Sequence, residues 1–331
     1  MTQPQVAPVH PTAAPAVPRV AVIIPNWNGA HLLPTCLDAL RCQVYRDFQT
    51  VVVDNGSQDG SRELLARAYP EVRGIPLPTN LFFSGAVNCG IRDTASPIIV
   101  LLNNDTEPEP RWLEELVAGL EAHPEAGMAT SKILLFDRRD TLHTAGDFYT
   151  LDGVPGNRGV WERDTGQYDG ATRVFGACAG AAAYRRAMLD DIGLFDEDFV
   201  GYCEDVDLSF RAQLAGYSCV YVPTARVYHR LSATGGGPLA SYLCGRNFIN
   251  VIVKNVPASL LRRYWWRMAR GQCRLTLEAL RHWREPAARA RIRGQLAALL
   301  AIPTMLVKRR EIQARRRVDD RTIEALLRSG L

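Results

Sequence analysis

The sequence predicts an α/β protein with a doubly wound, mainly parallel sheet and a basic helical extension at its C-terminus. Short runs of β-branched residues alternate with helical patterns through the first part of the chain, and acidic residues stand where apolar strands end. Open α/β sheets bind ligands at the carboxyl ends of their strands, so acids in those places indicate a ligand site. With 331 residues, 47% of them hydrophobic, the chain is long enough for a sizeable core.

Two β–α units open the folded part of the chain. The first is a strand over 20–24 and a helix over 33–40, in which leucines recur at i, i+4 and i+7. The second is a strand over 48–53 and a helix that begins at Ser61, a residue suited to capping a helix. The later elements are a short strand over 72–75, a helix over 84–93, a strand over 98–102, a helix over 112–120 and a helix from 204 to about 214.

The turn after the first strand reads PNWNG and lacks the glycine pattern of dinucleotide-binding folds. The chain also contains no G-x-x-x-x-G-K-[ST] loop. These two observations argue against dehydrogenases and P-loop ATPases. A nucleotide bound by this chain would be held by side chains and a metal ion more than by a glycine cradle.

Acidic residues mark two places in the sequence. Asp105 closes the run 98–105, which begins as an apolar strand, and Asp54 directly follows the strand over 48–53. Three more acids fall in the first turn of a helix, where acids favour the helix dipole. For Asp207 the dipole is a sufficient explanation, but the adjacent pair of Glu204 and Asp205 is more than capping requires and is suited to hold a general base.

The charge is unevenly distributed along the chain. From Lys254 onward there are 19 Lys and Arg residues against 6 Asp and Glu, whereas residues 1–253 are net acidic. We therefore expect a disordered tail over 1–18, a catalytic domain over 19–253 and a basic amphipathic helical extension over 254–331. An acidic domain that binds an anionic substrate needs a divalent cation between the two.

The basic extension suits an anionic membrane surface, because tryptophans at 265 and 266 stand among regularly spaced arginines. Its longest apolar run, 296–307, is too short to span a bilayer, so it lies on the membrane or packs on the core. We expect no nucleic-acid partner, since no nucleic-acid module is present. Eight cysteines without a C-x-x-C pair indicate a reduced, cytoplasmic protein.

Two further segments are expected to lie near the site. Residues 137–170 are rich in Gly, Asp and Thr without a sustained period, and predict a long excursion beside the site. Residues 232–237 have the composition of a closing loop or a simple linker.

Seven segments in order resemble the inverting family 2 glycosyltransferases of the GT-A fold, most closely their rhamnosyltransferase-like branch. The resemblance covers about residues 19–250. The segments are VAVIIPNWN, VVVDNGSQDGS, NLFFSGAVNCGI, VLLNNDTEPEPRWL, GACAGAAAYRRAML, IGLFDEDFVGYCEDVDLSFRAQLAGY and VYHR.

The resemblance implies roles for single residues. In the segment Asn103-Asn104-Asp105, Asp105 would hold Mg²⁺ or Mn²⁺, and Asn103 replaces the first acid of a D-x-D motif. His229 would be a further ligand of the metal or of the diphosphate, Asp205 the general base and Glu204 its neighbour. The nucleotide would be bound by Pro25, Asn26, Asn28, Asp54, Asp59, Asn80, Asn88 and Asn104, with Asp54 on the uracil or thymine ring.

The expected function is a metal-dependent inverting glycosyltransferase at the cytoplasmic face of the plasma membrane. It would move a sugar such as rhamnose from a UDP- or dTDP-sugar to a polyprenyl-linked or cell-envelope glycan. One alternative is a nucleotidyltransferase that makes activated sugars. Such an enzyme would need a Gly-rich first turn that bears Arg or Lys, and the turn PNWNG does not have this composition. The other, a non-catalytic glycan-binding relative, is disfavoured by the retention of Asp54, Asp105, Glu204 and Asp205.

Overall fold

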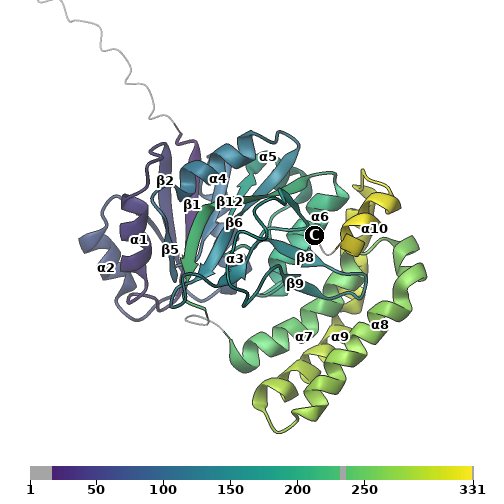
Figure 1. Ribbon diagram of the computed structural model, residues 1–331. Helices are drawn as coiled ribbons and strands as arrows, with labels where there is room; N and C mark the ends of the chain where they lie inside the picture. Colours follow the sequence, from purple (N-terminus) through teal and green to yellow (C-terminus); the bar gives the residue numbers. More distant parts are fainter. Residues whose placement is uncertain (1–16, 232–235, 330–331) are drawn as a thin grey trace, which may run out of the picture.

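The computed structural model describes residues 17–231 and 236–329 and has the predicted α/β architecture (Figure 1). Four parallel strands form one half of a large sheet. They are β1 (Val20–Asn26), β2 (Phe48–Asp54), β3 (Arg73–Pro76) and β4 (Ile98–Leu102). In register, Asn26 at the end of β1 lies beside Asp54 at the end of β2. The ends of these strands therefore deliver polar side chains to one rim of the sheet.

The second half of the sheet is mixed, and the strand order across the whole is β10-β12-β6-β11-β4-β1-β2-β3. β11 runs antiparallel to both β4 and β6, while β12 is parallel to β6. β5 pairs with β12, β7 pairs with β6, and β8 and β9 form a separate hairpin. The bounds are β5 (Thr106–Pro108), β6 (Ala126–Leu135), β7 (Leu142–Thr144), β8 (Asp147–Tyr149), β9 (Pro155–Asn157), β10 (Arg173–Val174), β11 (Ala181–Arg185) and β12 (Ser218–His229).

Helices cover both faces of the sheet, which makes it doubly wound as predicted. On one face α1, α2 and α4 pack through Leu37, Leu65 and Leu116, and on the other α3, α5 and α6 pack through Val87 and Leu208, among others. Their bounds are α1 (Leu33–Arg41), α2 (Ser61–Ala68), α3 (Phe82–Arg92), α4 (Trp112–Glu121), α5 (Arg186–Ile192) and α6 (Glu204–Leu214), with a 3₁₀ turn over Glu197–Phe199.

The segment expected as a long excursion, 137–170, contains the three short strands β7, β8 and β9. These strands hold side chains against the sheet where an irregular loop was expected. Of the segment expected to close over the site, 232–235 lies outside the described residues, as does most of the expected N-terminal tail.

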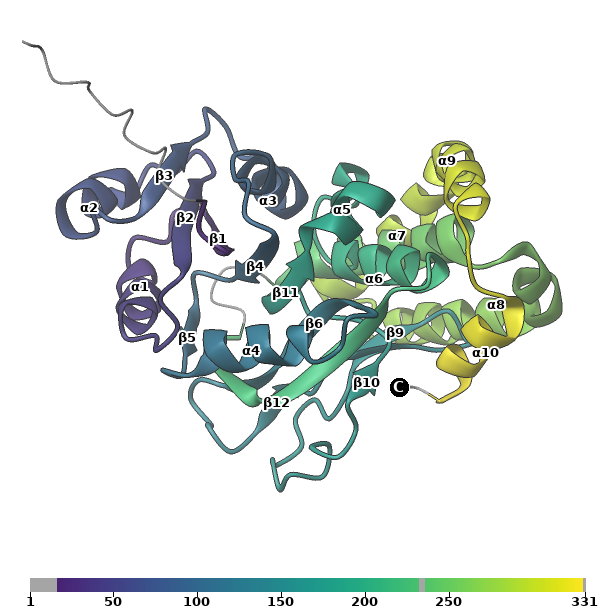
Figure 2. The same ribbon diagram turned by 90° about the horizontal axis from the view of Figure 1, so that it is seen from above.

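Four helices complete the chain and gather at the end of the molecule away from α1 and α2 (Figures 1 and 2). They are α7 (Gly237–Asn255), α8 (Ala258–Arg281), α9 (Pro286–Ala314) and α10 (Asp320–Ser329). α7 and α9 approach closely at two glycines. A Cβ atom on Gly245 would collide with the carbonyl oxygen of Arg291, and one on Gly294 with that of Tyr242.

Buried charges join these helices to the rest of the protein. Lys254 is 2% exposed, and its Nζ lies 2.6 Å from Asp196 Oδ2 and 2.7 Å from Asp207 Oδ1. Lys308 of α9 pairs with Asp196 as well. Burial alone would raise the pKa of Asp196, but the two lysines lower it to about 2. Asp207 also pairs with Arg211 one turn on, at 2.9 Å.

The boundary expected after residue 253 falls inside α7. The helix continues through it because Val251, Ile252 and Val256 belong to one core cluster with residues of α6, α8 and α10. The C-terminal helices therefore pack on the core, which was one of the two arrangements left open for them.

Among the described residues one helix, α9, has the length and composition to cross a membrane. The expectation that its apolar run is too short rested on 296–307 alone, whereas the helix extends over 29 residues. A core helix meets the same criteria. Here α9 buries Ala290, Gly294 and Ala298 within the protein.

Candidate active site

A cavity of about 820 Å³ opens at the carboxyl ends of β1 and β4. The excursion that carries β7 to β9, the segment before α6 and the first half of α7 supply its other walls. Eight of the residues expected at the site line this cavity, namely Pro25, Asn26, Asn80, Asn104, Asp105, Glu204, Asp205 and His229. The sheet thus brings together residues that lie up to about two hundred positions apart in the sequence.

Strand pairing places His229 beside Asp105. β12 runs antiparallel to β5, so that His229 lies opposite Thr106, the residue that follows Asp105. His229 Nε2 is 3.1 Å from Asp105 Oδ1, and both residues are buried, with side chains that are 11% and 2% exposed. A backbone hydrogen bond also joins the two segments, since the N–H of Arg230 donates to the carbonyl of Asp105 at 2.9 Å.

This pair fits a divalent cation. A carboxylate oxygen and an imidazole nitrogen are ligands that Mn²⁺ accepts and Mg²⁺ tolerates, and phosphate oxygens and water commonly fill the other positions of such ions. Asn103, at the first position of the motif, lines the same cavity without offering a charge. Asp105 is therefore the carboxylate that this segment contributes.

Asn26 and Asn104, both expected to bind the nucleotide, line the cavity and bond to each other. Asn104 Nδ2 donates to Asn26 Oδ1 at 2.7 Å, and Asn26 in turn lies 3.5 Å from Asp54 Oδ1. Asp54 itself is 2% exposed and does not line the cavity, and the guanidinium of Arg62 pairs with its carboxylate. A contact between Asp54 and a nucleotide base requires Arg62 to move away, and the Arg62 side chain is 45% exposed.

Three other residues expected around the nucleoside do not line the cavity. Asn28 bonds to the neighbouring loop, accepting from the N–H of Gln58 at 2.8 Å. Asp59 accepts from the N–H of Ala30 at 2.8 Å and from the start of α2. Asn88 is buried in α3 and exchanges two hydrogen bonds with the backbone of Phe195. In this structure the polar atoms of all three bond within the fold.

Glu204 and Asp205 open α6, directly after a strained stretch of backbone. Val200, Tyr202 and Cys203 all have positive φ, between 60° and 70°, which is uncommon for residues other than glycine. Asn247 of α7 holds this stretch in place. Its Nδ2 lies 2.9, 3.0 and 2.7 Å from the carbonyl oxygens of Phe199, Gly201 and Tyr202.

The environment of the two acids favours proton exchange. Asp205 Oδ2 accepts from the N–H of Ala179 at 3.2 Å, and Oδ1 accepts from the N–H of Val206 at 2.8 Å. Burial raises the pKa of Asp205 against the effect of these donors. Burial, and then the charge of Asp205, raise the pKa of Glu204 well above its ordinary value. Glu204 Oε2 has no hydrogen-bond partner within the described part of the chain.

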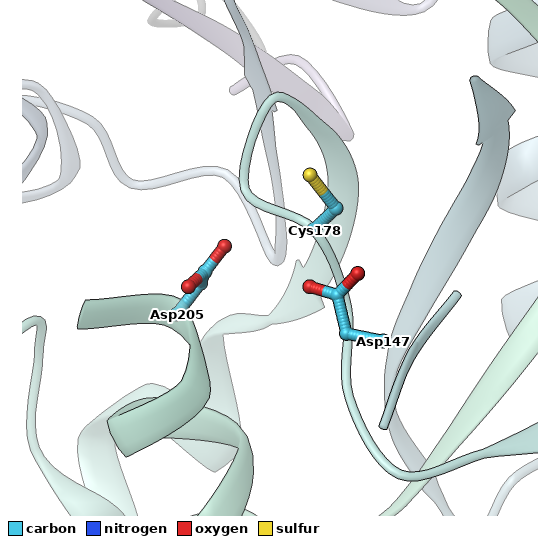
Figure 3. A group of neighbouring side chains, drawn as sticks. All are labelled: Asp147, Cys178 and Asp205. Atoms are coloured by element: carbon cyan, nitrogen blue, oxygen red, sulfur yellow. The ribbon is translucent and has the colours of Figure 1, made fainter. Parts of the chain in front are cut away.

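A third acid, Asp147 of β8, was not predicted from the sequence. Its carboxylate faces that of Asp205, and with the thiol of Cys178 their ligand atoms lie within 4.8 Å of one another (Figure 3). Burial, and then Asp205, raise the pKa of Asp147 well above its ordinary value. Burial raises the pKa of Cys178 as well, so the thiol stays protonated. A protonated soft ligand makes this group a poorer fit to Mg²⁺ or Mn²⁺ than Asp105 and His229.

His143 of β7 was also missed. Its Nδ1 lies 3.0 Å from Nδ1 of His229, and burial, followed by His229, lowers its pKa to about 4. His143 and Asp147 both come from the excursion, which the sequence marked only as Gly-, Asp- and Thr-rich. The segment holds many other ionisable residues, so nothing in the sequence singled out these two.

The wall that α7 contributes is apolar. Leu239, Leu243 and Phe248 line it, and Leu239 is 57% exposed at the rim. Acids and amides occupy the β-strand side of the cavity, so the site is polar on one side and apolar on the other. Such a cavity suits a substrate with a charged part and an apolar part.

Comparison with protein families gives a match over residues 21–193 to the model described as Glycosyl transferase family 2. Among curated proteins, the chain is 28% identical over 276 residues to N-acetylglucosaminyl-diphospho-decaprenol L-rhamnosyltransferase of Mycobacterium tuberculosis, covering 76% of this chain and 86% of the relative. It is 28% identical over 228 residues to polyprenol monophosphomannose synthase of Mycolicibacterium smegmatis, covering 66% and 78%.

Solved structures share the fold. A mannosyltransferase of Pyrobaculum calidifontis in complex with GDP-Man and Mn²⁺ has a TM-score of 0.53 at 18% identity, covering 91% of this chain and 86% of the neighbour. Residues 1–349 of S. aureus TarS in complex with UDP give 0.53 at 16% identity, covering 89% and 90%. The chain therefore has the GT-A fold.

Proposed function

Because the chain belongs to glycosyl transferase family 2, and is therefore a glycosyltransferase, we propose a metal-dependent inverting transfer for it. The donor is a UDP- or dTDP-sugar, such as dTDP-rhamnose, and the acceptor is a polyprenyl-linked or cell-envelope glycan. The observation that carries the proposal is that one cavity holds a cation-binding pair, Asp105 and His229, and an acidic pair, Glu204 and Asp205.

The donor end of the reaction belongs to the β-strand side of the cavity. Asp105 and His229 would hold Mn²⁺ or Mg²⁺, which when bound neutralises the charge that develops on the departing diphosphate. Asn26, Asn80 and Asn104 offer amide groups to the nucleotide on the same side. The structural neighbours named above were solved with GDP-Man and Mn²⁺ or with UDP, which supports a nucleotide diphosphate donor.

Asp205 would act as the general base. An acceptor hydroxyl must lose its proton as it attacks the anomeric carbon, and a buried carboxylate with a raised pKa takes up that proton more readily. The two backbone donors to Asp205 orient its carboxylate. A single displacement by this route inverts the configuration of the anomeric carbon, because the attack comes from the face opposite the leaving group.

The acceptor would lie along α7. A polyprenyl-linked glycan has an apolar chain and a polar sugar, which match the wall of Leu239, Leu243 and Phe248 and the acids facing it. By their names, one curated relative named above acts on a decaprenol-linked sugar and the other makes a polyprenol-linked sugar, which supports this class of acceptor.

We propose further that α8 rests on an anionic membrane surface at the cytoplasmic face. One stripe of this helix is apolar and exposed, at Trp266, Ala269, Cys273, Leu277 and Leu280, spaced as one helical face. A row of exposed arginines lies beside it, at Arg263, Arg270, Arg274 and Arg281. An apolar stripe edged by cations is the pattern of helices that lie in the bilayer interface.

A thermal-shift screen tests the donor. Nucleotide diphosphates and nucleotide sugars are added with and without Mn²⁺, and a ligand at a hundred times its dissociation constant stabilises the folded state by about 2.7 kcal/mol. We expect stabilisation by a uridine or thymidine diphosphate sugar only when the cation is present. Equal stabilisation without the cation, or a preference for purine nucleotides, would contradict the proposal.

A further inference from the structure

His143 extends the cation-binding pair into a chain of three residues. Its Nδ1 lies 3.0 Å from Nδ1 of His229, and the two rings stack with centroids 4.9 Å apart and an interplanar angle of 29°. His229 in turn presents Nε2 to Asp105 Oδ1 at 3.1 Å. Both nitrogens of His229 are therefore engaged, one with the acid and one with the second histidine.

Strand pairing sets this arrangement. Near its end, β6 is flanked on one side by β12, with Leu135 opposite His229, and on the other by β7, with Leu134 opposite Leu142. Leu142 directly precedes His143. The meeting of the two rings thus follows from the register of three strands, which fixes it more firmly than a loop would.

When a cation is bound to His229, only one distribution of protons over the nitrogens of the two imidazoles fits the contacts. A neutral imidazole carries one N–H and one lone pair, and a metal takes the lone pair. Since Nε2 of His229 faces Asp105, that nitrogen supplies the lone pair, and the proton of His229 resides on Nδ1. Nδ1–H then donates to His143, whose own Nδ1 must be unprotonated to accept it.

His143 is not placed as a third ligand. In the described part of the chain, the group of three histidine, cysteine or acidic residues with ligand atoms within 4.8 Å of one another is Asp147, Cys178 and Asp205, and it does not include His143. The contact of His143 with the pair runs through the ring of His229.

We propose that His143 is a positioning residue, which holds His229 in the tautomer and orientation that bind the donor-site cation. The inference rests on the proposed function, in which Asp105 and His229 hold that cation. Partners of this kind orient the metal ligand, and their loss commonly weakens metal affinity or activity by about 10- to 100-fold.

The test uses the full chain with Mn²⁺, in the presence of UDP and separately of dTDP, and measures free Mn²⁺ by electron paramagnetic resonance during a titration. His143→Asn keeps an acceptor oxygen near the position of Nδ1, whereas His143→Gln moves it one bond further out and His143→Leu removes it. We expect Mn²⁺ affinity to fall by about 10- to 100-fold in the Gln and Leu variants, and to be largely retained in the Asn variant.

His282→Gln on the exposed end of α8 is the matched control and should leave the affinity unchanged. Comparing the Asn and Gln variants keeps the test valid even if the Leu variant does not fold. Pulsed resonance of bound Mn²⁺ should show one imidazole nitrogen in both the wild type and the Asn variant.

Two results would overturn the inference alone. One is wild-type Mn²⁺ affinity in His143→Gln, and the other is two imidazole couplings in the wild type with one lost in His143→Asn, which would make His143 a direct ligand. If the wild type binds no Mn²⁺ with either nucleotide, the proposed metal dependence fails first, and the inference fails with it.

Discussion

In the proposed reaction, different side chains act at the two ends of one cavity. Asp105 and His229 serve the leaving group, and Asp205 serves the attacking hydroxyl. Each lies at the end of a strand or at the start of a helix, where a side chain faces the cavity without breaking a row of backbone hydrogen bonds. The two ends can therefore be tested separately by substitutions that leave the elements intact.

Asp105→Asn is predicted to remove the dependence of nucleotide binding on a divalent cation. The amide keeps the shape of the side chain but loses the charge that holds the ion, and Asn103 cannot replace it. Calorimetric titration of UDP and dTDP, with and without Mn²⁺, measures this directly. Asp59→Asn is the matched control, because Asp59 bonds to Ala30 and lies outside the cavity. Cation-dependent binding that persists in Asp105→Asn would refute the role.

Asp205→Asn is predicted to lower turnover by about 100-fold or more, while the affinity for the donor changes little. A general base acts on the acceptor proton and is not needed to hold the nucleotide, so chemistry and donor binding separate. Initial rates and donor titrations on the same preparation measure the two effects. If turnover stays at the wild-type level, Asp205 only caps α6, and Glu204 becomes the first alternative.

Part of this site is predictable from the sequence, and part is not. Asp105 and the pair Glu204–Asp205 were identifiable because an acid at the end of an apolar strand, or a doubled acid at a helix start, has little structural purpose. His143 and Asp147 were not, because short strand pairings in the excursion bring them to the site, and no sequence period marks those pairings. Asn88, expected to bind the nucleotide, bonds in this structure to the carbonyl of Phe195.

Among the elements, α7 connects the C-terminal helices to the acidic pair Glu204 and Asp205. It lines the cavity with apolar side chains, and through Asn247 it holds the strained backbone before Glu204. Strained conformations near active sites persist only where surrounding contacts hold them. This helix, which lies beyond the matched family region, therefore contributes to the geometry of the proposed base.

Asn247→Ala is predicted to lower stability by about 1–3 kcal/mol, because buried carbonyl oxygens lose their donor. We also expect turnover to fall at permissive temperature, as Tyr202 and Cys203 relax and move Asp205. Urea unfolding followed by rate measurements tests both effects. Ser241→Ala on the same helix is the control. A variant that loses stability but keeps full turnover would show that the strained backbone does not position the base.

If α8 rests on an anionic membrane surface, the protein should bind anionic liposomes in a salt-dependent way. Each well-placed cation near an anionic surface contributes about 1 kcal/mol, and salt weakens the attraction. We expect full-length protein to sediment with anionic liposomes at low salt and to be released at high salt. Trp266→Ser with Leu277→Ser should weaken this binding, whereas Trp161→Ser, which removes a similarly exposed tryptophan outside these helices, should not. Failure to bind at low salt would contradict the proposal.

For the whole molecule, the sheet and its covering helices follow from local patterns, because alternating strands and amphipathic helices allow few other topologies. The packing of the C-terminal helices on the core does not follow from local patterns. Their charge set them apart in the sequence, yet buried pairs such as Lys254 with Asp207 depend on partners about fifty positions away. A boundary drawn from composition therefore fell within α7, whose residues on both sides share one core.

In the proposed function, one cavity performs an inverting, cation-dependent transfer of a sugar. The most direct test is nuclear magnetic resonance of the product formed from dTDP-rhamnose, or from the donor found by the screen, with a polyprenyl-diphosphate-linked acceptor. The one-bond carbon–proton coupling at the new linkage reports its anomeric configuration. We predict the configuration opposite to that of the donor, with product formed only when Mn²⁺ or Mg²⁺ is present. A retained configuration, or equal transfer in excess chelator, would contradict the account.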